Sequence, residues 1–466
     1  MQVQDGLPNP QRLLAFVTVS IVLFLAVLDE AVVNVALPLM AQDLNATPGD
    51  ALWIINAYRL AVVMVLLPVA ALGDSFGYRR VYLGGIALFT AASLMSALAP
   101  SLEVLVAARV LQGLGAAGIM GINIALVRFI FPHAMLGRAV GNVAVVVAVS
   151  SAAGPSVAGA ILSVAPWPAL FLVNIPIGIL ALFVGYRTLP VTPGSGRPID
   201  VRSALFAALT FGLLIIGVNG LSEGGGLVWG LGLIGLALVL GAIFARSQLK
   251  KTAPMLPVDL LAMPVFALSA TTSMLAFAAY ALALASLPFY LHDVLLHSPA
   301  ITGLLMTPLP IGTAVAATIS GRLADRLAPG KLAAIGLSIF AIGLACLAVL
   351  PVDASNLDIV WRMALTGFGF GIFQAPNNKV MIGSAPRARS GGASAIQSTA
   401  RLLGQSVGVA LLAIVLSTQL SGGFTLGLGI AACLAAAGII PSALRRFEQP
   451  EAMLAPIAVV DEAGPA

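Results

Sequence analysis

Long apolar stretches separated by short polar breaks run along nearly the whole chain. About fourteen of them are long enough to cross a bilayer, which takes about 20 residues of helix. The first stretch lacks the short apolar core and small-residue cleavage site of a signal peptide, so we interpret it as a helix of the mature protein. We predict spans at residues 13–40, 51–71, 81–98, 102–127, 137–163, 167–187, 202–221, 227–245, 263–291, 299–321, 331–350, 358–383, 393–418 and 424–444.

The composition agrees with a chain embedded in lipid. Hydrophobic residues make up 60% of the 466 residues and charged residues only 9%, with a mean hydropathy of +1.05. Water-soluble domains average about 25% charged residues, and so few charges cannot cover a soluble surface. The sequence therefore predicts an all-α integral membrane protein with about fourteen transmembrane helices.

The basic residues indicate which way the helices run. If the N-terminus lies in the cytoplasm and the spans alternate, the internal loops carry basic residues such as Arg79 and Arg80. The external loops at 41–50 and 351–358 carry none. This asymmetry follows the positive-inside rule, and it predicts a multi-pass protein of the inner (plasma) membrane with both termini in the cytoplasm. The net charge of +5 reflects the same bias and requires no nucleic-acid partner.

Two pairs of short motifs repeat along the chain. ALGDSFGYRR at 71–80 resembles GRLADRLAPGK at 321–331, and RVLQGLGAAG from Arg109 resembles RMALTGFGFG from Arg362 at a similar offset. Two related halves of about six helices follow, and parallel repeats around a midplane cavity are a transporter architecture. The predicted organisation is an N-terminal six-helix bundle at 1–190, an inserted helix pair at 191–250, a C-terminal six-helix bundle at 251–446 and a disordered tail at 447–466.

Two adjacent carboxylates, Asp29 and Glu30, fall in the middle of the first span. A charge at that depth costs about 3 kcal/mol or more, so such a residue usually has a function or a partner. The two side chains point about 100° apart, so we expect one of them to face a central cavity. A carboxylate that gains and loses an arginine partner could load and release a proton. A permanent structural ion pair is the alternative.

Arginines in neighbouring spans are the natural partners of these carboxylates. Arg109 in the fourth span lies at a comparable depth, and Gln112 and Asn123 continue the same polar stripe at helical spacing. Arg59 in the second span is either a second ion-pair partner or a substrate contact. For Arg109 a satisfied buried arginine is the structural alternative.

Other polar residues in the spans are candidates for the wall of a substrate site, with polar contacts between helices as the alternative. The predicted substrate-binding residues are Glu30, Asn34, Asn56, Arg59, Gln112, Asn123, Gln374 and Arg401, and those predicted for proton coupling are Asp29, Glu30 and Arg109. The two cysteines lie in apolar spans and the three histidines have no ligand cluster around them. We therefore expect neither a metal nor a cofactor.

Four stretches resemble motifs of the fourteen-span drug:proton antiporter family of the major facilitator superfamily. LDEAVVNVALP at 28–38 resembles the first-helix motif, with Ala31 where Thr or Ser is usual. ALGDSFGYRR resembles the loop motif, and RVLQGLGAAG resembles the fourth-helix motif with its buried arginine. SSAAGPSVAGA at 150–160 resembles the fifth-helix antiporter motif. Each motif is short, but together, in order and at the right helices, they are specific.

The resemblance implies that Asp29 occupies the acidic position of the motif, that Arg109 takes part in proton transfer and that the Gly-Pro motif relates to the direction of antiport. Pro155 also removes a helix hydrogen bond and kinks its span. Asp74 could cap a helix and pair across the halves, and breaking such contacts is a plausible gate. The predicted gating residues are Asp74, Arg79, Arg80, Gly154, Pro155 and Asp325.

The sequence favours a proton-coupled multidrug efflux antiporter that exports lipophilic, cationic compounds by alternating access and so confers antibiotic resistance. No GxxxxGK[ST] nucleotide site occurs, so the ion gradient is the expected energy source and no enzyme activity is expected. The expected partners are a small-molecule substrate, protons and the lipid bilayer, and the protein is expected to be a monomer.

Two alternatives stay open at this point. Arg59, Arg109 and Arg401 outnumber the two carboxylates, which favours an exporter of an anionic or zwitterionic metabolite. A channel or sensor without coupled transport is the second alternative. A channel would be expected to show a ring of filter residues, whereas two related halves favour alternating access.

Overall fold

The computed structural model describes residues 6–132, 135–192, 194, 200–220, 227–249, 251, 258–323, 327–385, 390–417 and 422–445. The regular elements within these ranges are all helices. The N-terminal half contains α1 (Gln11–Asp43), α2 (Pro48–Phe76), α3 (Tyr78–Ala97), α4 (Leu102–Met120), α5 (Asn123–Ile130), α6 (Leu136–Leu162), α7 (Pro168–Leu172) and α8 (Asn174–Thr188).

Two helices, α9 (Val201–Gly220) and α10 (Leu227–Leu249), lie between the halves in sequence. The remaining elements are η2 (Val258–Ala262), α11 (Pro264–Phe289), η3 (Tyr290–Val294), α12 (Pro299–Met306), α13 (Pro308–Leu323), α14 (Pro329–Ala348), α15 (Asn356–Ser384), α16 (Ser390–Ser417), α17 (Gly423–Ala437) and α18 (Ile439–Ala443).

The all-α membrane fold predicted from the sequence is confirmed. Thirteen helical segments among the described residues are long and apolar enough to cross a membrane. The helix α15 adds a further segment of 29 residues that carries the charged Arg362 and Lys379. Four predicted spans are each divided into two helices, namely α4 and α5, α7 and α8, α12 and α13, and α17 and α18. The count is therefore consistent with the expected fourteen.

Four helices that follow loops predicted to face outward begin with a serine or threonine N-cap. The caps of α2, α4, α12 and α15 are Thr47, Ser101, Ser298 and Ser355. Each side-chain oxygen accepts a hydrogen bond from the backbone amide three residues later, with N···O distances from 3.1 to 3.5 Å. Such caps satisfy amide groups that the first turn of a helix leaves without a partner.

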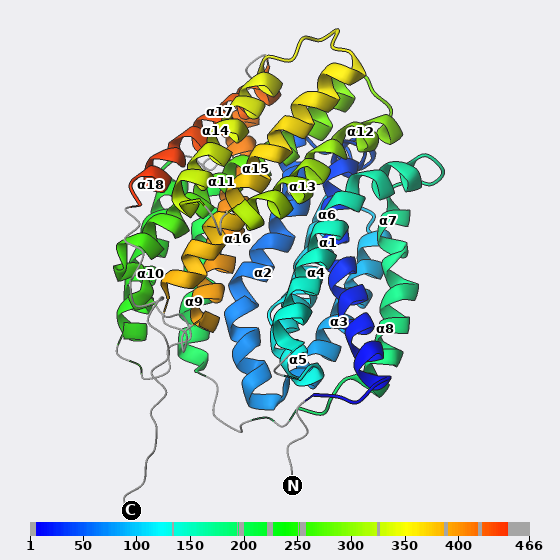
Figure 1. Ribbon diagram of the computed structural model, residues 1–466. Helices are drawn as coiled ribbons and strands as arrows, with labels where there is room; N and C mark the ends of the chain where they lie inside the picture. Colours follow the sequence, from blue (N-terminus) through cyan, green and yellow to red (C-terminus); the bar gives the residue numbers. More distant parts are fainter. Residues whose placement is uncertain are drawn as a thin grey trace, which may run out of the picture.

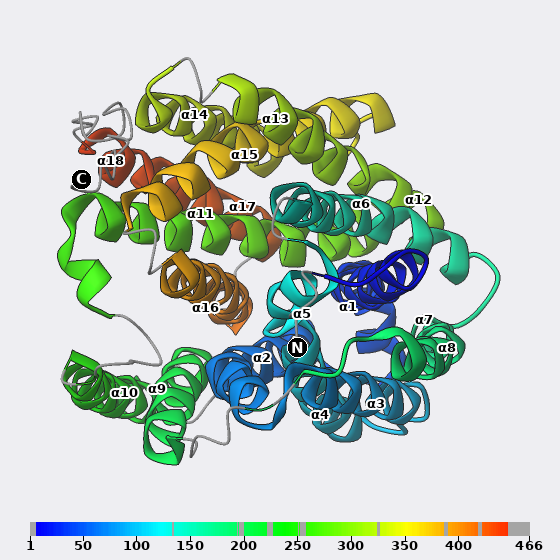
Figure 2. The same ribbon diagram turned by 60° about the horizontal axis from the view of Figure 1, so that its bottom comes forward.

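The same helix pairings recur in the two halves. Helix α1 packs against α6 as α11 packs against α16, and α3 contacts α4 and α8 as α14 contacts α15 and α17. This correspondence supports the proposed organisation into two related bundles. Helices α9 and α10 lie together at the edge of the molecule, where α9 contacts α2 and α16 (Figures 1 and 2).

An ion pair joins the start of α9 to the segment that follows α10. Lys251, after α10, donates hydrogen bonds to the carboxylate of Asp200 and the hydroxyl of Ser203 at the start of α9. Partial burial raises the pKa of Asp200, but the hydrogen bonds from Lys251 and Ser203 outweigh it, so the pKa lies below its ordinary value. The pair therefore favours the charged carboxylate and holds α9 beside α10.

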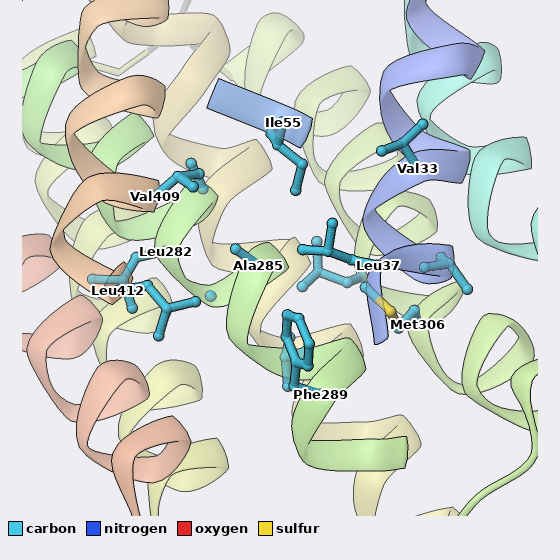
Figure 3. Close-up of a cluster of buried hydrophobic side chains, with 14 of the residues drawn as sticks. Val33, Leu37, Ile55, Leu282, Ala285, Phe289, Met306, Val409 and Leu412 are labelled. Carbon is cyan, nitrogen blue, oxygen red and sulfur yellow. The ribbon is translucent and has the colours of Figure 1, made fainter. Parts of the chain in front are cut away.

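An apolar cluster joins the two halves on the side toward which α1 ends (Figure 3). On α1 it begins within one turn of Glu30. Close packing of these side chains closes the interface between the halves on that side. The labelled members of the cluster are Val33, Leu37, Ile55, Leu282, Ala285, Phe289, Met306, Val409 and Leu412.

Candidate functional site

Asp29 lies fully buried in the middle of α1, with 1% of its surface exposed. Its Oδ2 atom forms an ion pair of 2.5 Å with Nη1 of Arg109 on α4. Its Oδ1 atom accepts hydrogen bonds from Nε2 of Gln112 at 2.9 Å and from Nδ2 of Asn174 on α8 at 2.7 Å. Both carboxylate oxygens therefore have donors, as a charge buried at this depth requires.

Arg109 connects the carboxylate to α2. Its Nε atom donates to the backbone oxygen of Ile54 at 3.1 Å, and Nη1 also donates to Oε1 of Gln112 at 2.6 Å. The guanidinium carbon lies 4.3 Å from the ring centre of Tyr58 and 5.8 Å from that of Phe171, both within cation–π range. Asp29 is the only carboxylate that pairs with Arg109 among the described residues, so protonation of Asp29 would leave Arg109 without a negatively charged partner.

Glu30 forms a second ion pair and is the more accessible carboxylate. Its side chain is 20% exposed, against 0% for that of Asp29. The Nε atom of Arg59 on α2 donates a hydrogen bond to Oε1 of Glu30 at 2.7 Å, and Nη2 forms an ion pair with the same oxygen at 2.7 Å. Nδ2 of Asn34 instead donates to the backbone oxygen of Glu30 at 2.7 Å, within α1. Of the two carboxylates, Glu30 is thus the one that a substrate could reach.

Two residues of the C-terminal half interact electrostatically with Glu30, namely Tyr280 of α11 and Arg401 of α16. The ring of Tyr280 stacks on Phe370 of α15, with centroids 4.3 Å apart and planes inclined by 19°. The ring of Phe277 meets the ring of Phe370 edge-on, with centroids 5.2 Å apart. The accessible carboxylate therefore lies among arginines from both halves, close to an aromatic cluster.

The role of the other predicted substrate contacts in binding stays a prediction. Asn123 lies 14 residues after Arg109, which is about 21 Å along a helix axis, and it is buried at the start of α5. Asn56 is fully buried in α2, and Gln112 is engaged with Asp29. Gln374 is half-buried on α15. A helical stripe in sequence fixes a shared face but not a shared depth, so the stripe from Arg109 to Asn123 is spread along the membrane normal.

Two members of the Asp29 network were not predicted from the sequence. Asn174 is an isolated polar residue in an apolar run of α8, which is a signal that could have identified it. Ser93 of α3 accepts hydrogen bonds from Gln112 at 2.9 Å and from Asn174 at 3.3 Å. A serine in an apolar span is too common to be singled out from the sequence.

A second buried network, also not predicted, lies in the C-terminal half. Arg445, 4% exposed, follows α18 and donates to Oδ1 of Asn377 at 2.6 Å, Oγ of Ser442 at 2.9 Å, Oγ of Ser269 at 3.1 Å and Oγ1 of Thr272 at 3.2 Å. Burial lowers the pKa of Arg445 to about 10, so the guanidinium stays charged at neutral pH. These hydrogen bonds tie α11, α15 and α18 together.

Three of the residues predicted to act as a gate lie at the junction of two helices, with Asp74 in the last turn of α2 and Arg79 and Arg80 in the first turn of α3. Asp74 is exposed and accepts a hydrogen bond from the hydroxyl of Tyr78. Arg79 is directed away from Asp74, toward the end of α8, where it donates to the backbone oxygen of Tyr186. No ion pair joins Asp74 to an arginine among the residues that the structure describes, and Asp325 lies outside them. The gating role stays a prediction.

The Gly154–Pro155 motif packs α6 against helices of both halves. A Cβ atom added at Gly154 would overlap the Cβ atom of Ala31, the residue that follows Glu30. A Cβ atom added at Gly303 of α12 would likewise overlap the backbone oxygen of Pro155. Glycine at both positions therefore allows α6 to bridge the carboxylate-bearing helix and the C-terminal half.

Within the described ranges, no group of three or more His, Cys, Asp or Glu side chains could hold a metal ion. Cys346 and Cys433 are free thiols. His292 lies in η3 and His297 in the loop after it, and Nδ1 of His292 is 3.1 Å from the backbone oxygen of His297. The chemistry described at the centre of the molecule is that of ion pairs, hydrogen bonds and aromatic rings.

The sequence matches the family model of the Major Facilitator Superfamily over residues 19–409 and 268–458. The chain belongs to the Major Facilitator Superfamily. The resemblance drawn from four short motifs is thereby confirmed. Proteins of this superfamily are transporters and not enzymes, which fits the multi-span helical membrane fold.

Curated relatives of this Major Facilitator Superfamily protein include drug-resistance transporters. The chain is 49% identical over 445 residues to "Uncharacterized transporter YebQ" of Escherichia coli (strain K12), which covers 95% of this chain and 97% of the relative. It is 31% identical over 417 residues to "Multidrug resistance protein Stp" of Mycobacterium tuberculosis, covering 89% and 77%. It is 28% identical over 428 residues to "Methyl viologen resistance protein SmvA" of Salmonella typhimurium, covering 90% and 85%.

Proposed function

We propose that this Major Facilitator Superfamily protein is a proton-coupled multidrug efflux antiporter that exports lipophilic compounds by alternating access. The observation that carries the proposal is the pair of adjacent ion pairs in the membrane, Asp29 with Arg109 and Glu30 with Arg59. One pair is sealed within the N-terminal half and the other is accessible. The relatives named for multidrug and methyl viologen resistance support an export function.

Proton coupling is assigned to Asp29. Its carboxylate is bound by three donors from α4 and α8, and α4 itself is bound to α2 through Arg109. Protonation of Asp29 removes its negative charge and so weakens its ion pair with Arg109. The relative stability of different packings of α1, α2 and α4 then changes. A coupling residue needs such a differential effect on two conformations, because a ligand shifts an equilibrium only by its differential affinity.

The apolar cluster between the halves lies on the external side of the membrane if both termini are in the cytoplasm. The first helix, α1, then starts in the cytoplasm and ends outside. The described conformation is then closed to the outside at Leu37 and Phe289. It would receive substrate from the cytoplasm as a monomer and release it outside after the halves rock about the central site.

A lipophilic cation is the first candidate substrate, because Glu30 offers an accessible negative charge and Tyr280 offers an aromatic face nearby. Proton and cation would then oppose each other through the neighbouring carboxylates, and each would lower the apparent affinity of the other. A zwitterionic or anionic compound is the second candidate. It is favoured by the presence of Arg59 and Arg401 beside the same carboxylate.

The purified protein in liposomes with an acidic lumen tests the proposal. A fluorescent lipophilic compound should accumulate inside in exchange for protons, and the ionophore nigericin, which collapses the pH gradient, should stop the uptake. The substrate would first be chosen by a growth screen of an efflux-deficient bacterial host against cationic, zwitterionic and anionic toxicants. Uptake that continues unchanged without the gradient would refute proton coupling.

A further inference from the structure

Two arginines from opposite halves each have a buried donor without an acceptor. Arg59 of α2 is 2% exposed, and its Nη1 atom has no hydrogen-bond partner although its other two nitrogens are bound to Glu30. The Nε atom of Arg401 on α16 is also buried without a partner. Buried donors in native proteins are nearly always paired, so both arginines have capacity for a further acceptor at this place.

The charges around Glu30 do not balance. Arg59 and Arg401 supply two positive charges against the single negative charge of Glu30. Arg401 makes no ion pair with a carboxylate in the described part of the chain. Asp29 and Arg109 neutralise each other and leave this excess unchanged. A carboxylate bound beside Arg401 would supply the counter-ion that this arginine lacks, as a charge removed from water requires.

The two arginines come from helices that lie side by side. Helix α2 packs against α16 across the interface between the halves (Figure 2). Arg59 is 11 residues from Pro48 at the start of α2, and Arg401 is 11 residues from Ser390 at the start of α16, about 16 Å along each helix. Both positions lie in the middle of the spans, where Glu30 interacts with both side chains.

An aromatic surface lies beside the same carboxylate. Tyr280 of α11 is half-buried and interacts electrostatically with both Glu30 and Arg59. Its ring stacks on Phe370, which also contacts the ring of Phe340 at 5.2 Å. A flat aromatic ring could lie against this surface while its polar groups reach the charged side chains.

We propose that Arg59 and Arg401 form a subsite for the carboxylate of an aromatic zwitterion. The cationic group of the same compound lies against Glu30, and its ring lies against Tyr280. A planar guanidinium presents parallel N–H donors that match a carboxylate, and this match favours a carboxylate over a neutral acceptor. The inference rests on the proposed export function and narrows its substrate class to compounds that carry both charges.

A matched pair of dyes separates the two charges. Rhodamine B carries a cationic ring system and a free carboxylate, whereas its ethyl ester keeps the ring system and loses the negative charge. Binding of each dye to the purified protein would be followed by fluorescence anisotropy at pH 7.5. We expect rhodamine B to bind wild type at least 10-fold more tightly than the ester.

Arg401→Gln is the decisive variant, because Arg401 has no carboxylate partner among the described residues that its loss would leave unpaired. It should weaken rhodamine B binding at least 10-fold and ester binding less than 3-fold, so the ester also reports that the variant is folded. Arg401→Lys should recover part of the affinity. The control is Arg202→Gln, which removes an exposed arginine of α9 and should change neither affinity.

The outcomes distinguish this inference from the proposed function. If wild type binds the ester as tightly as rhodamine B, or Arg401→Gln affects both dyes equally, the carboxylate subsite does not exist. Gradient-driven export of the ester in liposomes would then leave the exporter proposal standing. Failure of folded wild type to bind rhodamine B would also overturn the inference. Binding selectivity without any gradient-driven uptake would retain the subsite and reject the coupled exporter.

Discussion

Asp29 and Glu30 are neighbours in sequence but pair with arginines on two different helices, Arg109 of α4 and Arg59 of α2. The difference in exposure follows from the angle of about 100° between successive side chains on a helix. One carboxylate points into the N-terminal half and meets amide donors there. The other points to the interface between the halves. Two adjacent acidic residues can thus divide proton binding and substrate recognition between them.

Asp29→Asn should abolish transport that is driven by a pH gradient. It should also lower the free energy of unfolding by about 3–5 kcal/mol, because removing one partner of a buried ion pair leaves the other charge uncompensated. The double variant Asp29→Asn with Arg109→Gln should recover much of the lost stability and none of the transport. Thermal unfolding and liposome uptake measure the two effects separately.

A matched control for that experiment is Glu103→Gln, which neutralises an exposed carboxylate near the start of α4. It should leave both stability and transport near the wild-type values. Gradient-driven uptake by Asp29→Asn at the wild-type rate would show that the proton is carried elsewhere.

Glu30→Gln should mainly change which cations are recognised, because its carboxylate is accessible and removed from the Asp29 network. In wild type, raising the pH from 6 to 8 should tighten the binding of a lipophilic cation, since fewer protons then oppose it. Asp29→Asn should flatten this pH dependence, whereas Glu30→Gln should weaken cation binding at every pH. Anisotropy titrations of the three proteins provide the measurement. Cation affinity that is indifferent to pH in wild type contradicts the linkage.

The sequence predicts the membrane spans and a pairing of Arg109 with one of the two carboxylates, because lipid makes each buried charge conspicuous. It left Arg59 open between a second ion-pair partner and a substrate contact, and the structure pairs it with Glu30. The different roles of Asp29 and Glu30 were harder to predict from the sequence. The family motif pointed to Asp29, but its complete enclosure and the exposure of Glu30 depend on the rotation of α1 within the bundle.

Neutral polar residues were much harder to predict. Ser93 and Asn174 complete the Asp29 network, yet a single hydroxyl or amide in an apolar helix is ordinary. Asn123 shows what periodicity leaves open, because helical spacing placed it on the same stripe as Arg109 but did not fix its depth. The Arg445 network depends on where α18 meets α11 and α15. Contacts between segments that are far apart in sequence leave no periodic pattern from which they could be predicted.

Sidedness can be tested with single cysteines. Cysteine in place of Thr47, in the loop before α2, should react with an impermeant thiol reagent added to intact cells. Cysteine in place of Arg246, an exposed residue near the end of α10, should react only after the membrane is permeabilised. Both native thiols, Cys346 and the exposed Cys433, must first be replaced by alanine. The reverse pattern of labelling would reject the proposed cytoplasmic termini.

The contact between Gly154 and Ala31 gives a prediction with its own rescue. A methyl group at Gly154 would overlap the Cβ atom of Ala31, so Gly154→Ala should push α6 away from α1 beside the carboxylates. We expect a lower melting temperature and at least a 10-fold loss of transport. Ala31→Gly removes the atom that the new methyl group meets, so the double variant should recover a large part of both. Gly84→Ala on α3, where an added Cβ has no neighbour within 4 Å, is the matched control and should behave like wild type. A Gly154→Ala protein that transports normally would show that α6 has room to move. A double variant no better than the single one would place the effect in the flexibility of the helix at Pro155 and not in its packing against α1.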